Sequence, residues 1–238
     1  MEFIDRRVLG ALRFADAVTG ATVAAPLRVR ADGVRWIRNR RGWWVIASAP
    51  GLESHALSFE APPNLPALES VPVVVRVADD TGRYLPRRVR VRLPRTSAQA
   101  RADDDDSLFR PIDVRLFRAP AAPLVAGWAT VRVSAEEDGA PLGGALLRVV
   151  RASDPARVLG TGMTDARGEG VVPVPGIPAT TWQEGQGGVL QTELEAEVRL
   201  FWAADGEQPP DPDVLGGGAP LRTAAVTLAA GRDVAVRL

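Results

Sequence analysis

The 238-residue sequence contains no cysteine and no lysine, and all 29 of its basic residues are arginine. The absence of cysteine excludes disulfides, thiolate nucleophiles and zinc sites that depend on thiolate ligands. Without lysine, no Schiff base can form on a side-chain amine. His55 is the single histidine, so a metal site built from several histidines is excluded as well.

A long apolar run is also missing. The first ten residues include Glu2, Asp5, Arg6 and Arg7, whose charges interrupt the apolar stretch that a secretory signal requires. No later segment reaches the about 18 apolar residues of a membrane span. We therefore expect a protein without a membrane span that stays in the cytoplasm, or that is released as part of a particle without a signal peptide.

Helical periodicity is not sustained over three turns in any window, and 23 glycines and 20 prolines would break long helices. Short runs alternate apolar with polar residues instead, and turn residues such as Asp79 to Gly82 separate them, which predicts an all-β fold. The expected strands are 8–14, 27–30, 43–48, 71–77, 88–93, 113–117, 128–134, 146–150, 158–163, 170–174, 193–201, 224–228 and 234–238.

A linker divides these strands into two sets. Residues 119–123 read Ala-Pro-Ala-Ala-Pro, a small segment stiffened by proline. About seven short strands on either side are what a small antiparallel sandwich requires. We expect two tandem antiparallel β-sandwich modules, immunoglobulin-like or transthyretin-like, at residues 1–120 and 121–238. The irregular segments 62–72 and 208–220 are expected to be long surface loops or edge crossovers.

The two halves share an internal repeat in which a Leu-Arg-Val run precedes an Asn or Asp turn and then a Pro-Gly pair. The first copy is 27–29, 39–42 and 50–51, and the second copy is 147–149, 165–168 and 175–176. The common order indicates one duplicated module. Asn39 and Asp165 are expected to close Asx turns, and Gly42 and Gly168 to supply the positive φ that the reversal needs.

The second half resembles a known family. Residues 140–145 (Ala-Pro-Leu-Gly-Gly-Ala), 161–168 (Thr-Gly-Met-Thr-Asp-Ala-Arg-Gly) and 171–175 are similar to the Gly-x-Pro-Leu-x-Gly-Ala and Thr-Asp-x-x-Gly motifs of carboxypeptidase-regulatory-like, or transthyretin-like, domains. The first half is similar more faintly, since Asn39 stands in place of the aspartate. The resemblance implies a β-sandwich with an accessory or binding role, and it implies no reaction.

Few residues are arranged for catalysis. His55 follows Ser54 directly, and because neighbouring strand residues point to opposite faces, we expect a surface or loop histidine. The acidic run 103–106 could hold calcium, but it lacks the alternating spacing of a calcium loop, which favours a solvated acidic loop. The glycines 216–218 lack the Lys-Ser/Thr of a phosphate loop, and no acid pair suits hydrolysis. We predict no enzymatic activity, catalytic residue, cofactor or metal.

The net charge of zero hides an asymmetry. Residues 1–120 carry 20 arginines against 14 acidic residues, whereas residues 121–238 carry 9 against 15. Oppositely charged halves favour head-to-tail contact between copies or oriented docking onto a polar partner.

Three of these arginines, Arg88, Arg90 and Arg92, are expected on one side of a strand, where they could form a basic sheet face with Arg76. The interleaved aromatic residues that sheet-type readers of nucleic acid use for stacking are missing, so nucleic acid is not the expected partner. Arginine suits bidentate pairing with carboxylates. We interpret the three residues as candidate contacts to a protein.

Six tryptophans accompany a single tyrosine, and Trp36, Trp43 and Trp44 are close in sequence. As neighbouring strand residues, Trp43 and Trp44 would face opposite sides, so one ring is expected to be exposed and to contact a protein or a sugar.

These features together predict a non-enzymatic structural or adaptor protein that acts through protein–protein interfaces in a larger assembly. A phage-tail-like contractile injection particle is the first setting to consider. The alternative is a ligand-binding or adhesive module for carbohydrate that uses the tryptophan region.

Overall fold

The computed structural model describes residues 7–57, 62–178, 181–182, 189–190, 192–204 and 207–238, and nearly all of its regular structure is β strand, as the sequence predicted. Within these residues the helical elements are α1 (Glu53–Leu57), one 3-10 turn (Gln99–Arg101) and α2 (Pro212–Leu215). None of the described helices is long and apolar enough to cross a membrane.

Seven strands form the regular structure of the first half. They are β1 (Gly10–Asp16), β2 (Leu27–Arg30), β3 (Arg35–Arg38), β4 (Trp44–Ser48), β5 (Val71–Asp79), β6 (Arg87–Leu93) and β7 (Ile112–Leu116). They make one sheet of order β3-β4-β1-β7 and another of order β2-β5-β6. Both sheets contribute to one hydrophobic core, Leu12 from the first sheet and Val75 from the second being examples.

The second half is built in the same way. Its strands are β8 (Ala129–Ser134), β9 (Glu136–Glu137), β10 (Ala140–Pro141), β11 (Leu146–Arg151), β12 (Asp154–Met163), β13 (Glu169–Val174), β14 (Thr181–Trp182), β15 (Val189–Leu190), β16 (Glu193–Phe201), β17 (Arg222–Ala229) and β18 (Asp233–Arg237). The main sheets have the orders β12-β11-β16-β17 and β13-β8-β18. They share a second core, to which Leu147 and Val131 belong.

The longer strands of the two halves follow one topology. Counted along each half, positions one to seven are β1 to β7 in the first half and β8, β11, β12, β13, β16, β17 and β18 in the second. In both halves, the first strand lies between the fourth and the seventh in one sheet, and the fifth lies between the second and the sixth in the other. The third strand differs, since β3 pairs with β4 whereas β12 pairs with β11. The common strand order accompanies the sequence repeat, while the duplication of one module stays a prediction.

Two strand pairs depart from the expected antiparallel arrangement. β1 runs parallel to β7, and β8 runs parallel to β18. In each half the last strand returns from the other sheet to lie beside the first strand, and such a crossover is not bound to the reversed direction that a hairpin imposes. The sheets that contain β1 and β8 are therefore mixed.

The predicted turns are confirmed. The Asn39 side chain accepts hydrogen bonds from the backbone of Arg41 and Trp43, and the Asp165 side chain accepts them from Arg167 and Glu169. Gly42 and Gly168 have φ of 80° and 76°, the left-handed region that glycine adopts without steric cost. The Asp79 turn closes with Gly82 at φ 70°.

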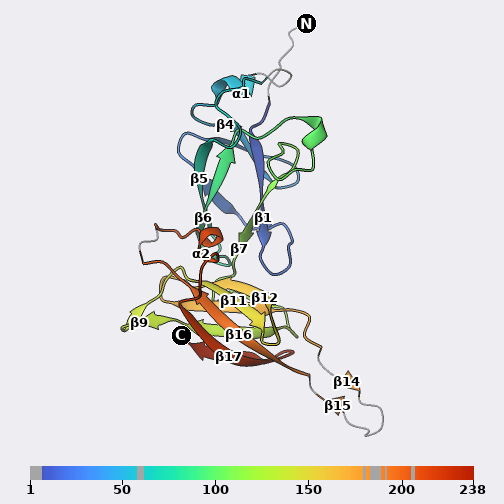
Figure 1. Cartoon of the computed structure of the whole chain (residues 1–238), viewed down its shortest axis with the longest axis vertical. Helices are drawn as coiled ribbons and strands as arrows, with labels where there is room; N and C mark the ends of the chain where they lie inside the picture. Colours follow the sequence, from blue (N-terminus) through green and yellow to red (C-terminus); the bar gives the residue numbers. More distant parts are fainter. Residues whose placement is uncertain (1–6, 58–61, 179–180, 183–188, 191, 205–206) are drawn as a thin grey trace.

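The segment 208–220, expected to be a long surface loop or edge crossover, connects β16 to β17 and contains α2, and part of it is buried. Asp211 is 8% exposed, and α2 lies between the two halves of the molecule (Figure 1). A third apolar cluster joins Leu85 and Phe117 of the first half to Leu146, Met163 and Phe201 of the second. The residues of the two larger cores lie on either side of 119–123, while the boundary at residue 120 stays a prediction.

Candidate interaction surface

The β2-β5-β6 sheet has one apolar and one basic side. On β6, Val89, Val91 and Leu93 are buried while Arg90 and Arg92 are exposed, and the same alternation holds for β2. The alternation arises because successive strand residues point to opposite faces. We call the outward arginines the basic face, and they are Arg28, Arg30, Arg76, Arg88, Arg90 and Arg92.

The strand register brings three of these arginines into one row. Arg30 on β2 lies opposite Arg76 on β5, and Arg76 lies opposite Arg88 on β6. Like charges directly opposite one another destabilise a sheet. The basic face therefore carries an electrostatic cost that an anionic partner would relieve.

Acidic residues of the chain neutralise the basic face in part. Asp80 pairs with Arg28 and Glu207 with Arg88, while Asp32 lies 4.0 Å from Arg76 and is itself fully exposed. In the described part of the chain, Arg30, Arg90 and Arg92 form no ion pair.

A groove of about 480 Å³ lies at one end of the basic face. Arg28, Arg30 and Arg76 line it from the first half, and Gln208 and Pro209 line it from the second. The backbone NH of Arg88 donates a hydrogen bond of 2.9 Å to the carbonyl of Pro210. The segment after residue 207 thus forms one wall of the groove and ties it to β6.

In the corresponding sheet of the second half, one strand carries a row of acidic residues. On β16, which occupies the position of β5, Glu193 and Glu195 are exposed and Glu197 is half-buried. We call these three the acidic row. Arg199 pairs with Glu197 at 2.5 Å, Arg232 lies 4.0 Å from Glu193, and the Thr227 hydroxyl donates to Glu195 over 3.0 Å.

The three tryptophans are all half-buried, so the expectation of an exposed ring is not met. Trp36 and Trp44 pack edge to face, 6.4 Å between ring centroids, against the first core. Trp43 precedes β4 and lies in the Asn39 turn, with the Arg41 guanidinium 5.4 Å over its ring. Strand alternation does not apply to a turn residue, which is why the expectation failed. Their role in an interface stays a prediction.

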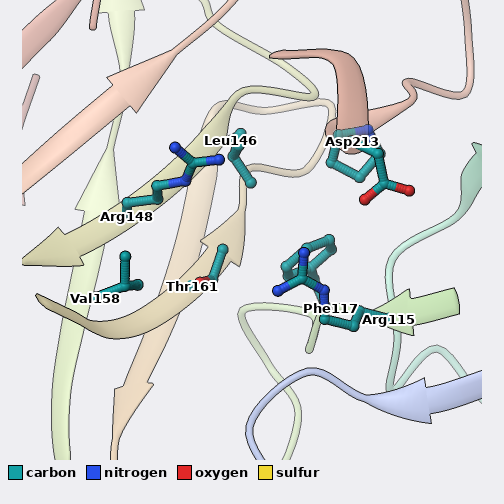
Figure 2. A pocket seen from close by; sticks show the side chains of 8 residues that line it. Arg115, Phe117, Leu146, Arg148, Val158, Thr161 and Asp213 are labelled. Atoms are coloured by element: carbon teal, nitrogen blue, oxygen red, sulfur yellow. The ribbon is translucent and has the colours of Figure 1, made fainter. Parts of the chain in front are cut away.

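A second pocket, of about 470 Å³, lies where the two halves meet. Arg148, Val158 and Thr161 approach it from the second half and Arg115 and Phe117 from the first, with Asp213 of α2 above them (Figure 2). Two of its charged side chains, Asp213 and Arg148, already have structural partners. Asp213 pairs with Arg87, and Arg148 lies 5.0 Å over the Phe201 ring and donates to the Gly216 carbonyl.

The acidic run 103–106 is organised by arginine. Arg101 pairs with Asp104 and Asp106 at 2.8 and 2.7 Å, and Arg110 pairs with Asp105 at 3.1 Å. Among the residues that the structure describes, no group of three or more metal-ligating side chains gathers at one point.

His55 was expected at the surface, and this is wrong. It lies on α1 rather than on a strand, and it is 2% exposed. The helix packs its histidine beneath the segment that begins at Pro62, and burial, followed by the charge of Arg7, lowers the pKa of His55.

Sequence reasoning found Arg76, Arg88, Arg90 and Arg92 but missed Arg28 and Arg30. The signal was present, since Leu27-Arg28-Val29-Arg30 alternates in the same way.

No protein-family model matches the chain, and no curated protein matches it in sequence.

Proposed function

We propose that this chain is a non-enzymatic structural or adaptor protein made of two tandem β-sandwich modules, and that it assembles head to tail. In this assembly the basic face of one copy docks on the acidic row of the next. The observation that carries the proposal is the Arg30–Arg76–Arg88 row, beside Arg90 and Arg92, which pair with no acid among the described residues. The acidic row on β16, the equivalent strand of the second half, has the opposite charge.

Charge complementarity argues for a second copy as the partner. The two surfaces are different patches of one chain, so the contact is heterologous and propagates into a ring or a filament. Charges steer such an association and fix its register more than they add affinity. A structural component of a particle needs this kind of contact, and we propose a phage-tail-like contractile injection particle as the first setting to search.

The alternative, carbohydrate binding by the tryptophan region, has less support. Sugar-binding surfaces use the open face of an aromatic ring, whereas Trp36 and Trp44 pack against the core and Arg41 lies over Trp43.

Sedimentation of the purified chain over a concentration series, at about 50 mM and about 500 mM NaCl, tests the proposal, because exposed charges interact weakly at high salt. We expect the wild type to associate at low salt and to dissociate at high salt. The triple variant Arg30→Glu/Arg90→Glu/Arg92→Glu, and separately Glu193→Arg/Glu195→Arg/Glu197→Arg, should each remain monomeric at both.

Two comparisons make this test specific. The variant Arg40→Glu/Arg157→Glu/Arg237→Glu changes the net charge equally at exposed positions outside the basic face, and it should associate as the wild type does. In the first variant both surfaces are acidic, and in the second both are basic. A mixture of the two variants should therefore associate. A wild type that stays monomeric at low salt, or a mixture that does not associate, would contradict head-to-tail assembly.

A further inference from the structure

A third pocket, of about 430 Å³, lies in the first half and is lined by none of the arginines of the basic face. The residues that line it are Arg7, His55, Pro62, Pro63, Asn64, Pro66, Leu68, Arg95, Thr96, Ser97 and Ala98. Two arginines and the single histidine contribute to this lining, and none of the described residues in it is acidic.

Arg7 is the most unusual of these residues. It is 5% exposed, and it forms no ion pair in the described part of the chain. Its guanidinium donates two long hydrogen bonds of 3.4 Å, to the Ser97 hydroxyl and to the Arg95 carbonyl, and its Nε is buried without a partner. Burying a charge without a counterion is costly, and buried arginines are normally paired.

His55 adds a second unsatisfied group. It is 2% exposed, and its Nδ1 is buried without a hydrogen-bond partner, while the Pro63 backbone hydrogen-bonds to the ring. A neutral imidazole can carry its remaining proton on only one nitrogen, so an acceptor placed near Nδ1 would favour the doubly protonated ring.

Arg95 is held in place by neutral groups. It is 5% exposed, and its donors go to the carbonyls of Ser107 and Asp105, over 2.6 to 2.9 Å. Asp106 and Glu69 lie near enough to raise its pKa, although burial has the larger, lowering effect. Arg95 therefore adds positive potential, the Arg7 Nε is a donor without an acceptor, and the His55 Nδ1 becomes a second donor once the ring is protonated.

We propose that this pocket binds a tetrahedral oxyanion, the sulfate or phosphate group of a small ester, between Arg7, His55 and Ser97. Guanidinium groups form strong, charge-assisted hydrogen bonds with such oxygens. Pro62, Pro63 and Pro66 provide an apolar wall for the organic part of the ester, and the volume lies in the range of small-molecule sites, about 300 to 1,000 Å³.

The single histidine makes a direct test practicable, because the chain gives one set of imidazole NMR signals. Sodium sulfate is titrated into the full chain at pH 6.5 and constant ionic strength, with sodium chloride as the reference. We expect a saturable shift of the His55 signals and a rise of about one unit in the His55 pKa at saturation, since a nearby anion favours the charged ring. Phosphoserine and inorganic phosphate should act in the same way.

Two variants separate a built site from general salt effects. Arg7→Met should weaken sulfate binding by about tenfold or more, because it removes the charged donor, whereas Arg157→Glu/Arg237→Glu, at exposed positions of the second half, should leave binding unchanged. If Arg7→Met does not fold, Ser97→Ala, which removes a single hydroxyl, should weaken binding several-fold. Absence of a saturable shift with all three anions, or equal binding by Arg7→Met or Ser97→Ala and the wild type, would overturn the proposal. Acetate that competes as strongly as sulfate would do so too, by showing a carboxylate site.

Discussion

Asp16 links three segments of the first half through one buried carboxylate. It lies at the end of β1, is 3% exposed, and accepts hydrogen bonds of 2.9 Å from the backbone of Val18 and Thr19, from the Tyr84 hydroxyl and from Arg118. Burial alone would raise the pKa of Asp16, but the hydrogen bonds from Thr19, Tyr84 and Val18, together with the charge of Arg118, lower it. The carboxylate is therefore ionised in the folded chain, and it binds Arg118, the residue before the linker.

Tyr84, the only tyrosine, reports on this arrangement. Burial, followed by the hydrogen bond to Asp16, raises the pKa of Tyr84 to about 12. Its folded pKa lies above the usual 10, so this contribution to stability is complete below pH 10 and is lost as the pH rises toward 12. Absorbance at 295 nm should show a single phenol titrating near 12, and a midpoint near 10 would contradict the contact.

The matching variant, Tyr84→Phe, should lower the free energy of unfolding at pH 7 by about 1.5 to 3 kcal/mol, the usual range for a hydrogen bond to a charged group. Urea unfolding at pH 7 measures the loss. Above pH 12 wild type and variant should differ much less.

Among the strands, β12 approaches β13 closely enough to require glycine. A Cβ added at Gly162 would lie 2.4 Å from the Val171 carbonyl oxygen, and one at Gly160 would lie 2.7 Å from that of Pro173. Backbone atoms cannot move aside as a flexible side chain can, so the two sheets of the second half would have to separate.

Gly162→Ala should therefore destabilise the chain by about 1 to 3 kcal/mol, the usual cost of overpacking. Gly217→Ala is the matched control, because nothing lies within 4 Å of the added Cβ and its φ is not positive. Urea denaturation of both variants measures the difference. Equal stability of the two would show that β12 can shift without cost.

Alternation placed some strands well, since β2 and β16 begin and end where the sequence pattern put them. It missed β3, and it placed β1 two residues too early. Which strands pair was not predictable, because pairing depends on contacts between residues far apart in the chain. The parallel pairs and the different partners of β3 and β12 are of this kind. Alternation also predicts the basic face, because it assigns each outward arginine from its apolar neighbours.

Arg87 is a position where strand alternation and residue type indicate opposite sides of the sheet. It has the same parity as Val89, Val91 and Leu93, so the pattern places its side chain toward the interior, yet an arginine suggests the surface. The structure follows the parity, and Arg87 is 0% exposed. The partners that make this burial tolerable are more than 120 residues away, at Asp211 and Asp213, and no local pattern indicates them. The Arg7 and His55 pocket was missed for the same reason.

At the scale of the whole molecule, Arg87 of the first half forms ion pairs with two aspartates of the second half. Its Nη1 donates to the Arg115 carbonyl at 2.8 Å, and its Nη2 donates to Asp211 at 3.3 Å and to Asp213. Asp211 also caps α2, accepting a hydrogen bond from the Asp213 backbone. The ion pairs thus fix α2 between the two halves, beside the groove of the basic face.

Replacing Arg87 with methionine keeps much of the side-chain volume but leaves the buried Asp211 carboxylate without its counterion. Removing one partner of a buried ion pair costs about 3 to 5 kcal/mol, and we expect a loss of that size in urea unfolding at pH 7. Arg90→Met, on the exposed side of the same strand, should change stability by less than about 0.5 kcal/mol.

The double variant Arg87→Met/Asp211→Asn distinguishes a lost ion pair from lost packing. Asparagine can still cap α2 but carries no charge, so the double variant should recover part of the stability that Arg87→Met loses. Small-angle scattering of Arg87→Met under native conditions should show a larger radius of gyration, because the halves are then joined by the apolar cluster, the linker and the contacts of Arg88 with Pro210 and Glu207, without the buried ion pair. Unchanged stability and scattering would mean that those apolar contacts suffice to hold the halves together, and that the ion pairs contribute little to their arrangement.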